Sequence, residues 1–370
     1  MKATNGTTYR MLQTNLQRVS TRLEDLRTQG ATGIKLSKPS DDPSSIRPVL
    51  TTRTQLMHTD RYLETMGVTL DKMESTDGHL NHVENILQRV KEIANNSING
   101  AMSNEDLTVF ADEVHHMKQE LLDAANAQVD GKYIFSGYAE NTKPFVRNAA
   151  YDPALYDQTD STTWAYLYMG TPNPTTLEIT PGEELESNLT GNDLFLGVSN
   201  QYWVDSATPA TGPGVAPANT PPETDRIDIF SLLERTEEAL RSRSTDLTAA
   251  DTLDVAADAM EASGNLAGAT ANRAAADARR DILNGKLDEL ELAANQNRRL
   301  RSQLGNRAAR VEAADLHQQD VRIDLKQILS RYQDTDAIEN FNDIIKQETA
   351  FQAALSITSK VSQISILDYF

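Results

Sequence analysis

The chain has 370 residues, enough for two or three domains, and no cysteine, which excludes disulfides, thiol catalysis and zinc–thiolate sites. Its formal net charge of −19 argues against broad nucleic-acid binding, because an acidic surface repels phosphates. No stretch approaches the ~20 consecutive apolar residues of a membrane span, so we expect neither a nucleic-acid partner nor a membrane.

The first expected element is a helix close to the N-terminus. Its apolar residues are spaced alternately by four and three positions, which is the pattern of a coiled-coil stripe. The stripe comprises Leu12, Leu16, Val19, Leu23 and Leu26. Because a lone amphipathic helix is marginal in water, we expect it to pack against the other end of the chain or against other subunits.

A helix break is expected within "TGIKLSKPSDDPSSIRP", residues 32–48, which holds three of the 13 prolines. A proline inside a helix costs about 3 kcal/mol, and the residue before it is pushed to an extended conformation. One of the two aspartates is expected to cap or turn the chain before the next helix. The predicted break comprises Pro39, Asp41, Asp42, Pro43 and Pro48. We do not expect the aspartates to be a catalytic pair, because neighbouring side chains diverge and no partner acid or base is close.

After the break the apolar helical pattern resumes. It comprises Leu56, Leu63, Met66, Leu70, Met73 and Leu80. The polar stretch "NNSINGAMSN", residues 95–104, predicts a turn between two antiparallel helices. A third helix is expected from about residue 104 to residue 129.

The middle of the chain, residues 144–225, has a different composition. It contains ten of the 13 prolines, and from Tyr151 to Asp225 it has acidic residues but no Lys or Arg. Short apolar runs such as "WAYLYM" and "LEIT" are separated by turn dipeptides, which predicts a small β-rich domain facing water. The stretch "SATPATGPGVAPANTPPETD" is expected to be a linker.

The C-terminal arm has no proline after Pro222 and is rich in good helix formers. The polar stretch "QDTD" follows Tyr332 and is expected to start a last helix. The apolar stripe of that helix comprises Ile338, Phe341, Ile345, Phe351 and Leu355.

These elements predict a mainly α fold, a long helical rod or coiled coil built from both chain ends with an inserted small β-rich domain. The expected parts are an inner helical segment (1–38), two halves of a helical rod domain (39–143 and 226–330), a β-rich outward insert (144–225) and a C-terminal inner helix (331–370). Subunit or intrachain packing is assigned to Leu12, Leu16, Val19, Leu23, Leu26, Phe341, Ile345, Phe351 and Leu355.

Several ordered segments resemble the flagellin superfamily, and within it the subunits that join the flagellar hook to the filament. In the N-terminal arm they are "TGIKLSKPSDDPSSIRPVL" and "DGKYIFSGYAENTKPF". In the C-terminal arm they are "SQLGNRAARVE" and the whole of residues 330–370. The insert is similar more weakly, through "LEITPGEELESNLTGNDLF".

The resemblance implies a structural subunit of the bacterial flagellum that is exported unfolded through the flagellar type III channel and located outside the cell. Its terminal helices would fold on assembly. The implied partners are neighbouring copies of the chain, the other hook–filament junction protein, flagellin, and an export chaperone at the C-terminal helix. A filament-forming flagellin is the alternative within the same class, and the "KPSDDP" and "ILDYF" segments favour the junction subunit.

Other chemistries are weaker hypotheses. His79, His82, His115 and His116 could approach one another across the predicted helical hairpin and bind zinc or nickel, but solvated or interface histidines are the simpler interpretation. Glu183 and Glu184 could suggest a surface hydrolase, although acidic pairs are more often just surface. Nucleophile and phosphate-binding motifs are missing. We therefore expect no enzyme and no catalytic, cofactor-binding or metal site. A soluble monomeric helical bundle remains the structural alternative.

Overall fold

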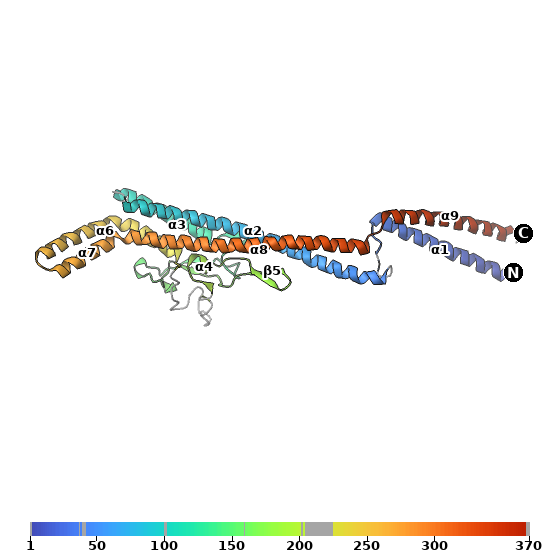
Figure 1. Ribbon diagram of the computed structural model, residues 1–370, viewed down its shortest axis with the longest axis horizontal. Coiled ribbons are helices and arrows are strands. Elements are labelled where there is room, and N and C mark those ends of the chain that lie inside the picture. Colours follow the sequence, from blue (N-terminus) through green and yellow to red (C-terminus); the bar gives the residue numbers. More distant parts are fainter. Residues whose placement is uncertain are drawn as a thin grey trace. The chain divides into compact units, whose positions relative to one another are not determined.

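The computed structural model describes residues 2–36, 38, 42–99, 102–158, 160–200, 203 and 225–367, without the side chains of 2–6, 8, 9, 99 and 361–367. They form two compact units. The terminal unit consists of Met1–Leu63 with Leu316–Phe370, and the central unit is Glu64–Asp315. Both units are built mainly from long helices (Figure 1).

The terminal unit brings the two ends of the chain together. Helix α1 (Lys2–Thr32) and helix α9 (Ala337–Leu367) lie side by side, and the first part of α2 (Pro43–Asn99) and the last part of α8 (Ile282–Gln333) belong to the same unit (Figure 1). The connections that follow α1 and α8 are paired by backbone hydrogen bonds. Lys35 N donates to Gln333 O at 2.7 Å, and Thr335 N donates to Gly33 O at 2.9 Å.

In the central unit, α2 and α8 run antiparallel. Arg301 Nε lies 2.6 Å from an oxygen of Asp77, and Arg298 Nε lies 2.9 Å from an oxygen of Glu84. The apolar stripe expected after the break is well buried here, since Met66, Met73 and Leu80 are no more than 2% exposed. The unit is completed by α3 (Asn104–Ala125), α6 (Ile229–Ala262) and α7 (Leu266–Arg280).

The prediction of a third helix up to about Val129 is wrong at its C-terminal end, because α3 stops at Ala125. Strands β1 (Gln128–Val129) and β2 (Lys132–Tyr133) follow as an antiparallel hairpin. Its two turn residues, Asp130 and Gly131, have φ angles of 53° and 76°. An Asp-Gly pair tolerates this left-handed geometry, which matches the twist of a tight hairpin.

The insert contains two further antiparallel pairs. Strand β3 (Phe145–Arg147) pairs with β4 (Tyr166–Tyr168), and β5 (Thr176–Thr180) pairs with β6 (Glu183–Glu186). The remaining elements are the 3-10 helices Pro153–Leu155 and Ser161–Thr163 and the short helix α4 (Gly191–Phe195). Rings of Phe135, Phe145, Tyr166, Phe195 and Phe230 pack together with centroids 4.6–5.5 Å apart.

This aromatic cluster joins the insert to the start of α6, so the insert is part of the central unit.

The predicted mainly α fold with a small β-rich insert is confirmed. Most of the expected linker lies outside the described residues. The five-part division of the chain stays a prediction. Among the helices of the described ranges, none is long and apolar enough to span a membrane.

Candidate functional site

The α1–α9 pair is the first candidate site, because the sequence assigns subunit contacts to it. On α1, the predicted stripe faces inward: Leu23 and Leu26 are buried, and Leu12, Leu16 and Val19 are half-buried. Alternating steps of four and three residues place all five on one side of the helix. The stripe therefore has a partner inside the chain, but that partner covers it fully only near the C-terminal end of α1.

The face of α9 toward α1 is largely polar or small. Asn340 is buried, and its Oδ1 lies only 2.8 Å from the position that a Cβ on Gly30 would take. The half-buried positions that continue this face are Ile344, Gln347, Phe351, Ala354 and Thr358. The predicted apolar stripe includes only Phe351 of these positions, because most of the others are polar or small.

Two polar contacts tie the helices together. Arg27 Nη2 donates to an oxygen of Glu348 at 3.0 Å, and Gln347 Nε2 donates to the backbone oxygen of Val19 at 3.4 Å. Both Arg27 and Glu348 are exposed, so their ion pair contributes only about 0–1 kcal/mol. These contacts align the two helices but contribute little stability.

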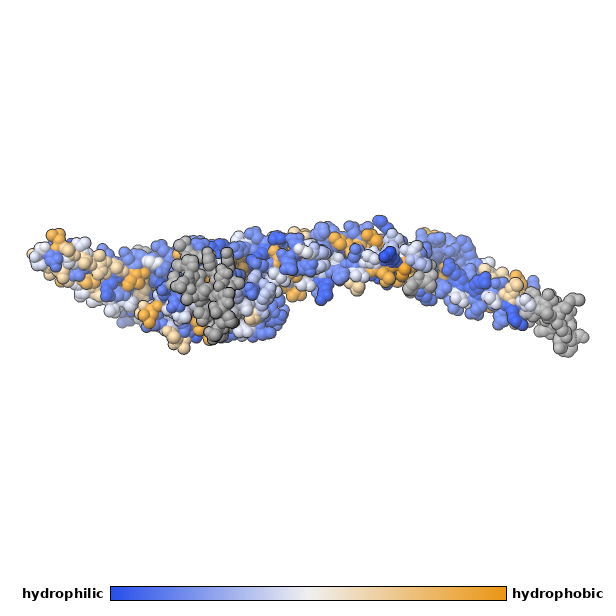
Figure 2. Space-filling model, turned by 90° about the horizontal axis from the view of Figure 1, so that it is seen from below, coloured by the Kyte–Doolittle hydropathy of each residue, from blue (hydrophilic) through white to orange (hydrophobic). Residues whose placement is uncertain are grey.

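A second face of α9 is apolar and turned to solvent. Ile338 and Phe341 are 77% and 63% exposed, and Ile345 and Leu355 are also exposed. Of the residues assigned to packing on this helix, only Phe351 is half-buried within the chain. On the surface of the helices, hydrophobic residues (orange) are interspersed among hydrophilic ones (blue) (Figure 2). That Phe341, Ile345 and Leu355 pack against other subunits stays a prediction.

The helix break is centred on Asp42. Its carboxylate accepts hydrogen bonds from Ser44 N and Ser44 Oγ at 3.0 and 2.6 Å and from Ser45 Oγ at 2.7 Å. The hydrogen bonds from Ser44, then that from Ser45, lower the pKa of Asp42 to about 2. Asp42 thus caps α2, and Pro43 occupies the first helical position, where its missing N–H costs nothing.

The prediction that Pro48 breaks the helix is wrong, because Pro48 lies inside α2. It sits in the second turn, so the hydrogen bond that it cannot donate would have gone to Ser44 in the first turn. Pro39 and Asp41 lie outside the described residues.

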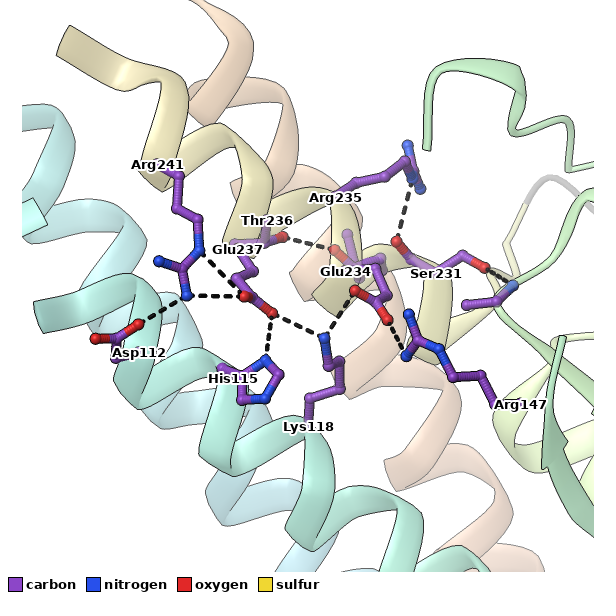
Figure 3. A network of polar contacts seen from close by, with 12 residues as sticks. Asp112, His115, Lys118, Arg147, Ser231, Glu234, Arg235, Thr236, Glu237 and Arg241 are labelled. Carbon is purple, nitrogen blue, oxygen red and sulfur yellow. Dashed lines mark hydrogen bonds and ion pairs between the residues drawn. The ribbon is translucent and has the colours of Figure 1, made fainter. Parts of the chain in front are cut away.

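A second candidate is a buried polar network between α3 and α6 (Figure 3). Lys118 is only 2% exposed, and its Nζ donates to Glu234 at 2.7 Å and to Glu237 at 2.8 Å. Arg147 of β3 also donates to Glu234, at 2.8 Å, and Arg241 donates to Glu237 at 3.1 Å. Burial opposes the charge of Glu237, but the hydrogen bonds from Lys118, Arg241 and His115 outweigh it and lower the pKa of Glu237.

The beginning of α6 is fixed by a buried carboxyl group. Asp228 accepts hydrogen bonds from Phe230 N and Ser231 N at 3.0 and 3.3 Å, and the Ser231 hydroxyl donates to its second oxygen. Ser231 Oγ also accepts a hydrogen bond from Ala165 N in the insert. Burial raises the pKa of Asp228 to about 6, partly offset by these hydrogen bonds. This chain of contacts holds the insert to α6.

The histidines do not form a metal site in the described part of the chain. His115 Nδ1 lies 3.2 Å from Glu237, and His82 lies 3.8 Å from Glu120. Burial and the nearby His82 lower the pKa of His79. No group of three or more His, Asp or Glu side chains among the described residues could hold a metal ion.

The acidic pair of the insert is engaged in the sheet. Glu183 accepts a hydrogen bond from Arg310 of α8 at 2.8 Å. Glu184 lies directly across the β5–β6 ladder from Glu178, on the exposed face of the strands. These positions belong to a surface hairpin fastened to α8.

Comparison with known proteins identifies the N-terminal arm. Residues 4–140 match the family described as the bacterial flagellin N-terminal helical region. The match confirms the resemblance to the flagellin superfamily over this region.

Two curated proteins are similar over 118 residues, both flagellar hook-associated protein 3. The one from Escherichia coli is 27% identical and the one from Salmonella typhimurium 25%. The similar stretch covers 32% of this chain and 37% of each relative.

Solved structures share the fold. Flagellar hook associated protein-3 from Legionella pneumophila has a TM-score of 0.53 at 16% identity, covering 76% of this chain and 98% of that one. FlgL from Xanthomonas campestris has a TM-score of 0.52 at 15% identity, with coverages of 75% and 99%. At these identities the similarity concerns the fold alone.

Proposed function

We propose that this chain is a structural subunit of the bacterial flagellum that joins the hook-side junction protein to the flagellin filament. The match of residues 4–140 to the flagellin N-terminal helical region supports the flagellar role. The similarity to two hook-associated proteins favours the junction over the filament. In this role the chain has no catalytic step and needs no cofactor.

The observation that carries the proposal is the incomplete burial of the terminal helices. Burying an apolar side chain of this size contributes roughly 1.5–3 kcal/mol, and α9 leaves several of them in water. Contacts with neighbouring copies of the chain, the other junction protein and flagellin would cover them. Before assembly, an export chaperone would cover the same face of α9.

Export fits the covalent chemistry of the chain. A subunit that leaves the cell unfolded through a narrow channel must not be held by disulfides, and this chain has no cysteine. The proposed location is therefore the extracellular flagellum.

Deletion of residues 336–370 tests the proposal. The central unit should remain folded, as judged by circular dichroism and thermal unfolding, because its own core is buried within residues 64–315. Cells that carry only the deletion variant should have hooks without attached filaments. Normal filaments on these cells would contradict the proposal.

Immunolabelling of flagella with wild-type chain separates the two flagellar roles. A label confined to the hook–filament boundary is expected for the junction subunit. A label along the whole filament would instead identify a filament-forming flagellin.

A further inference from the structure

A cavity of about 230 Å³ lies within the central unit, between α2, the β1–β2 hairpin and the β5–β6 hairpin. A water molecule takes about 30 Å³ of the liquid, so the cavity has room for roughly seven waters or for one small organic molecule. The proposed flagellar role makes no use of this cavity. Its lining groups therefore indicate separately what it would bind.

One wall of the cavity is a face of α2 that carries hydroxyl groups on both sides of a single cation. Thr69, Lys72 and Thr76 are three and four residues apart, so they lie on the same side of the helix. Thr69 Oγ1 donates to Thr65 O and Thr76 Oγ1 donates to Lys72 O, both at 2.8 Å. Each hydroxyl thus uses its proton within α2 and keeps a lone pair that can accept a hydrogen bond.

Lys72 gives the cavity its charge. Its side chain is half-buried, and no ion pair engages its ammonium group in the part of the chain that the structure describes. Asp71 and Glu74 are exposed and lie on other sides of α2, because residues one or two positions apart on a helix do not face each other. The other charged lining groups, Lys132 and Glu140, are paired with each other. Two lysines against one glutamate leave the lining with a net charge of +1.

The opposite wall is held in place by hydrogen bonds. Thr175 O accepts from Ser187 N at 2.7 Å and from Ser187 Oγ at 2.9 Å, and Thr175 N donates to Asn188 Oδ1 at 2.8 Å. Arg307 of α8 in turn donates to Asn188 O at 2.9 Å. A ligand would therefore meet a preformed wall, as small-molecule sites usually provide.

The lining offers both donors and acceptors to a ligand. No hydrogen bond within the described ranges uses the hydroxyl groups of Tyr133 and Thr176, which line the cavity. Together with the Lys72 ammonium group they are available donors. Thr69 and Thr76 supply acceptors on the α2 side. This set suits a ligand that has a negative charge and hydroxyl groups of its own.

We propose that this cavity binds a small organic monoanion that carries hydroxyl groups, of the size and chemistry of a hexuronate. One unpaired cation matches one carboxylate, whereas a dianion such as phosphate would leave a negative charge unbalanced near Glu140. Val68 and Leu177 supply apolar contacts for the CH groups of a sugar ring. The site goes beyond the proposed function, and neither depends on the other.

Isothermal titration calorimetry of the purified full chain with sodium glucuronate tests the site. A single site per chain is expected, with a dissociation constant of about 1 mM or lower for a ligand of this size. Glucose, which has the hydroxyl groups but no charge, should bind about tenfold more weakly, because a hydrogen bond to a charged group contributes this much. Phosphate should also bind more weakly than glucuronate.

Two lysine variants assign the charge. Lys72→Met keeps the length of the side chain but removes its cation, so it should weaken glucuronate binding about tenfold. Lys143→Met removes an exposed lysine of the same unit and is the matched control, which should bind glucuronate like the wild type. Circular dichroism of each variant verifies folding. An equal loss in both variants would indicate a general effect of net charge and would overturn the proposal.

A third variant separates the cavity from the lysine alone. Val68→Phe narrows the cavity without a change of charge, and the fold should tolerate it because Val68 is 50% exposed. It should weaken glucuronate binding at least as much as Lys72→Met. Unchanged binding in Val68→Phe would place the anion on Lys72 outside the cavity and would contradict the site.

Three results with the wild-type chain would also overturn the proposal. They are absence of binding at glucuronate concentrations about tenfold above the expected dissociation constant, equal binding of glucose, and tighter binding of phosphate. None of them bears on the proposed function, because that is tested on flagella and not on the purified chain.

Discussion

The terminal and central units have the same kind of helical stripes but bury them to different extents. In the central unit, Leu80, Val83, Leu87 and Val90 of α2 are no more than 1% exposed. In the terminal unit, Phe341 on α9 is 63% exposed. The difference teaches that an apolar stripe does not by itself identify its partner. The central stripes are buried within the chain, whereas the apolar stripe of α9 remains largely exposed, as the proposed contacts with other molecules would require.

Matched phenylalanine truncations should give the largest contrast between the units. Phe230→Ala should lower the free energy of unfolding by about 3–5 kcal/mol, because Phe230 is fully buried among Phe145, Tyr166 and Phe195. Phe341→Ala should change it by no more than about 0.5 kcal/mol and yet reduce incorporation into flagella. Urea unfolding and quantification of the chain in isolated flagella measure both effects. A large loss of stability in Phe341→Ala would remove the contrast.

Removal of the buried cation tests how the central unit is held together. Lys118→Met should cost about 3–5 kcal/mol at pH 7, because it leaves Glu234 and Glu237 without their shared partner. Lys91→Met removes an ion pair with Glu291 that is nearly half exposed, and this control should cost no more than about 1 kcal/mol.

The cost of Lys118→Met should shrink as the pH falls. The lowered pKa of Glu237 stabilises the wild type above the ordinary carboxyl range, and this contribution is lost as the pH falls through the folded-state pKa. The Lys118→Met variant lacks most of this pH-dependent stabilisation, because Lys118 is the main group that lowers the pKa of Glu237. Urea unfolding at pH 7 and pH 4 measures the change, and an equal cost at both values would show that Glu237 is not the group affected.

Loss of the α2 cap should have a local effect within the terminal unit. Asp42→Ala removes the acceptor for Ser44 N and the Ser44 and Ser45 hydroxyls, so the first turn of α2 should exchange its amide protons faster. Because the pKa of Asp42 is lowered to about 2, its contribution is present above the ordinary carboxyl pKa and disappears toward pH 2. Protection of this turn that is unchanged in the variant at pH 7 would argue against the cap.

Glycine substitutions should give the smallest contrast. Gly78→Ala in the central part of α2 meets no atom within 4 Å and should stabilise the chain by about 0.5–1 kcal/mol through helix propensity. Gly30→Ala should gain less, because its Cβ would lie 2.8 Å from Asn340 Oδ1. Thermal unfolding of both variants measures the difference, and equal gains would show that α9 does not approach Gly30 so closely.

Periodicity and proline placement were sufficient to predict the helical arms and the insert from the sequence. The hairpin at Asp130–Gly131 was missed although its signal, an Asp-Gly pair, is present. The Lys118 network could not be predicted, because it joins residues more than 100 positions apart whose charges look like any surface charges. Nor could the face of α9 toward α1 be recognised from an apolar pattern, since Asn340 and Gln347 are among its residues.

Hydrogen exchange on the purified chain in dilute solution tests the central claim most directly. If the terminal helices need neighbouring molecules, amides of α1 and α9 should exchange far faster than those of α2 around Leu87 in the dilute chain. They should become protected in isolated flagella. Protection of α1 and α9 equal to that of the central unit in the dilute chain would contradict the account.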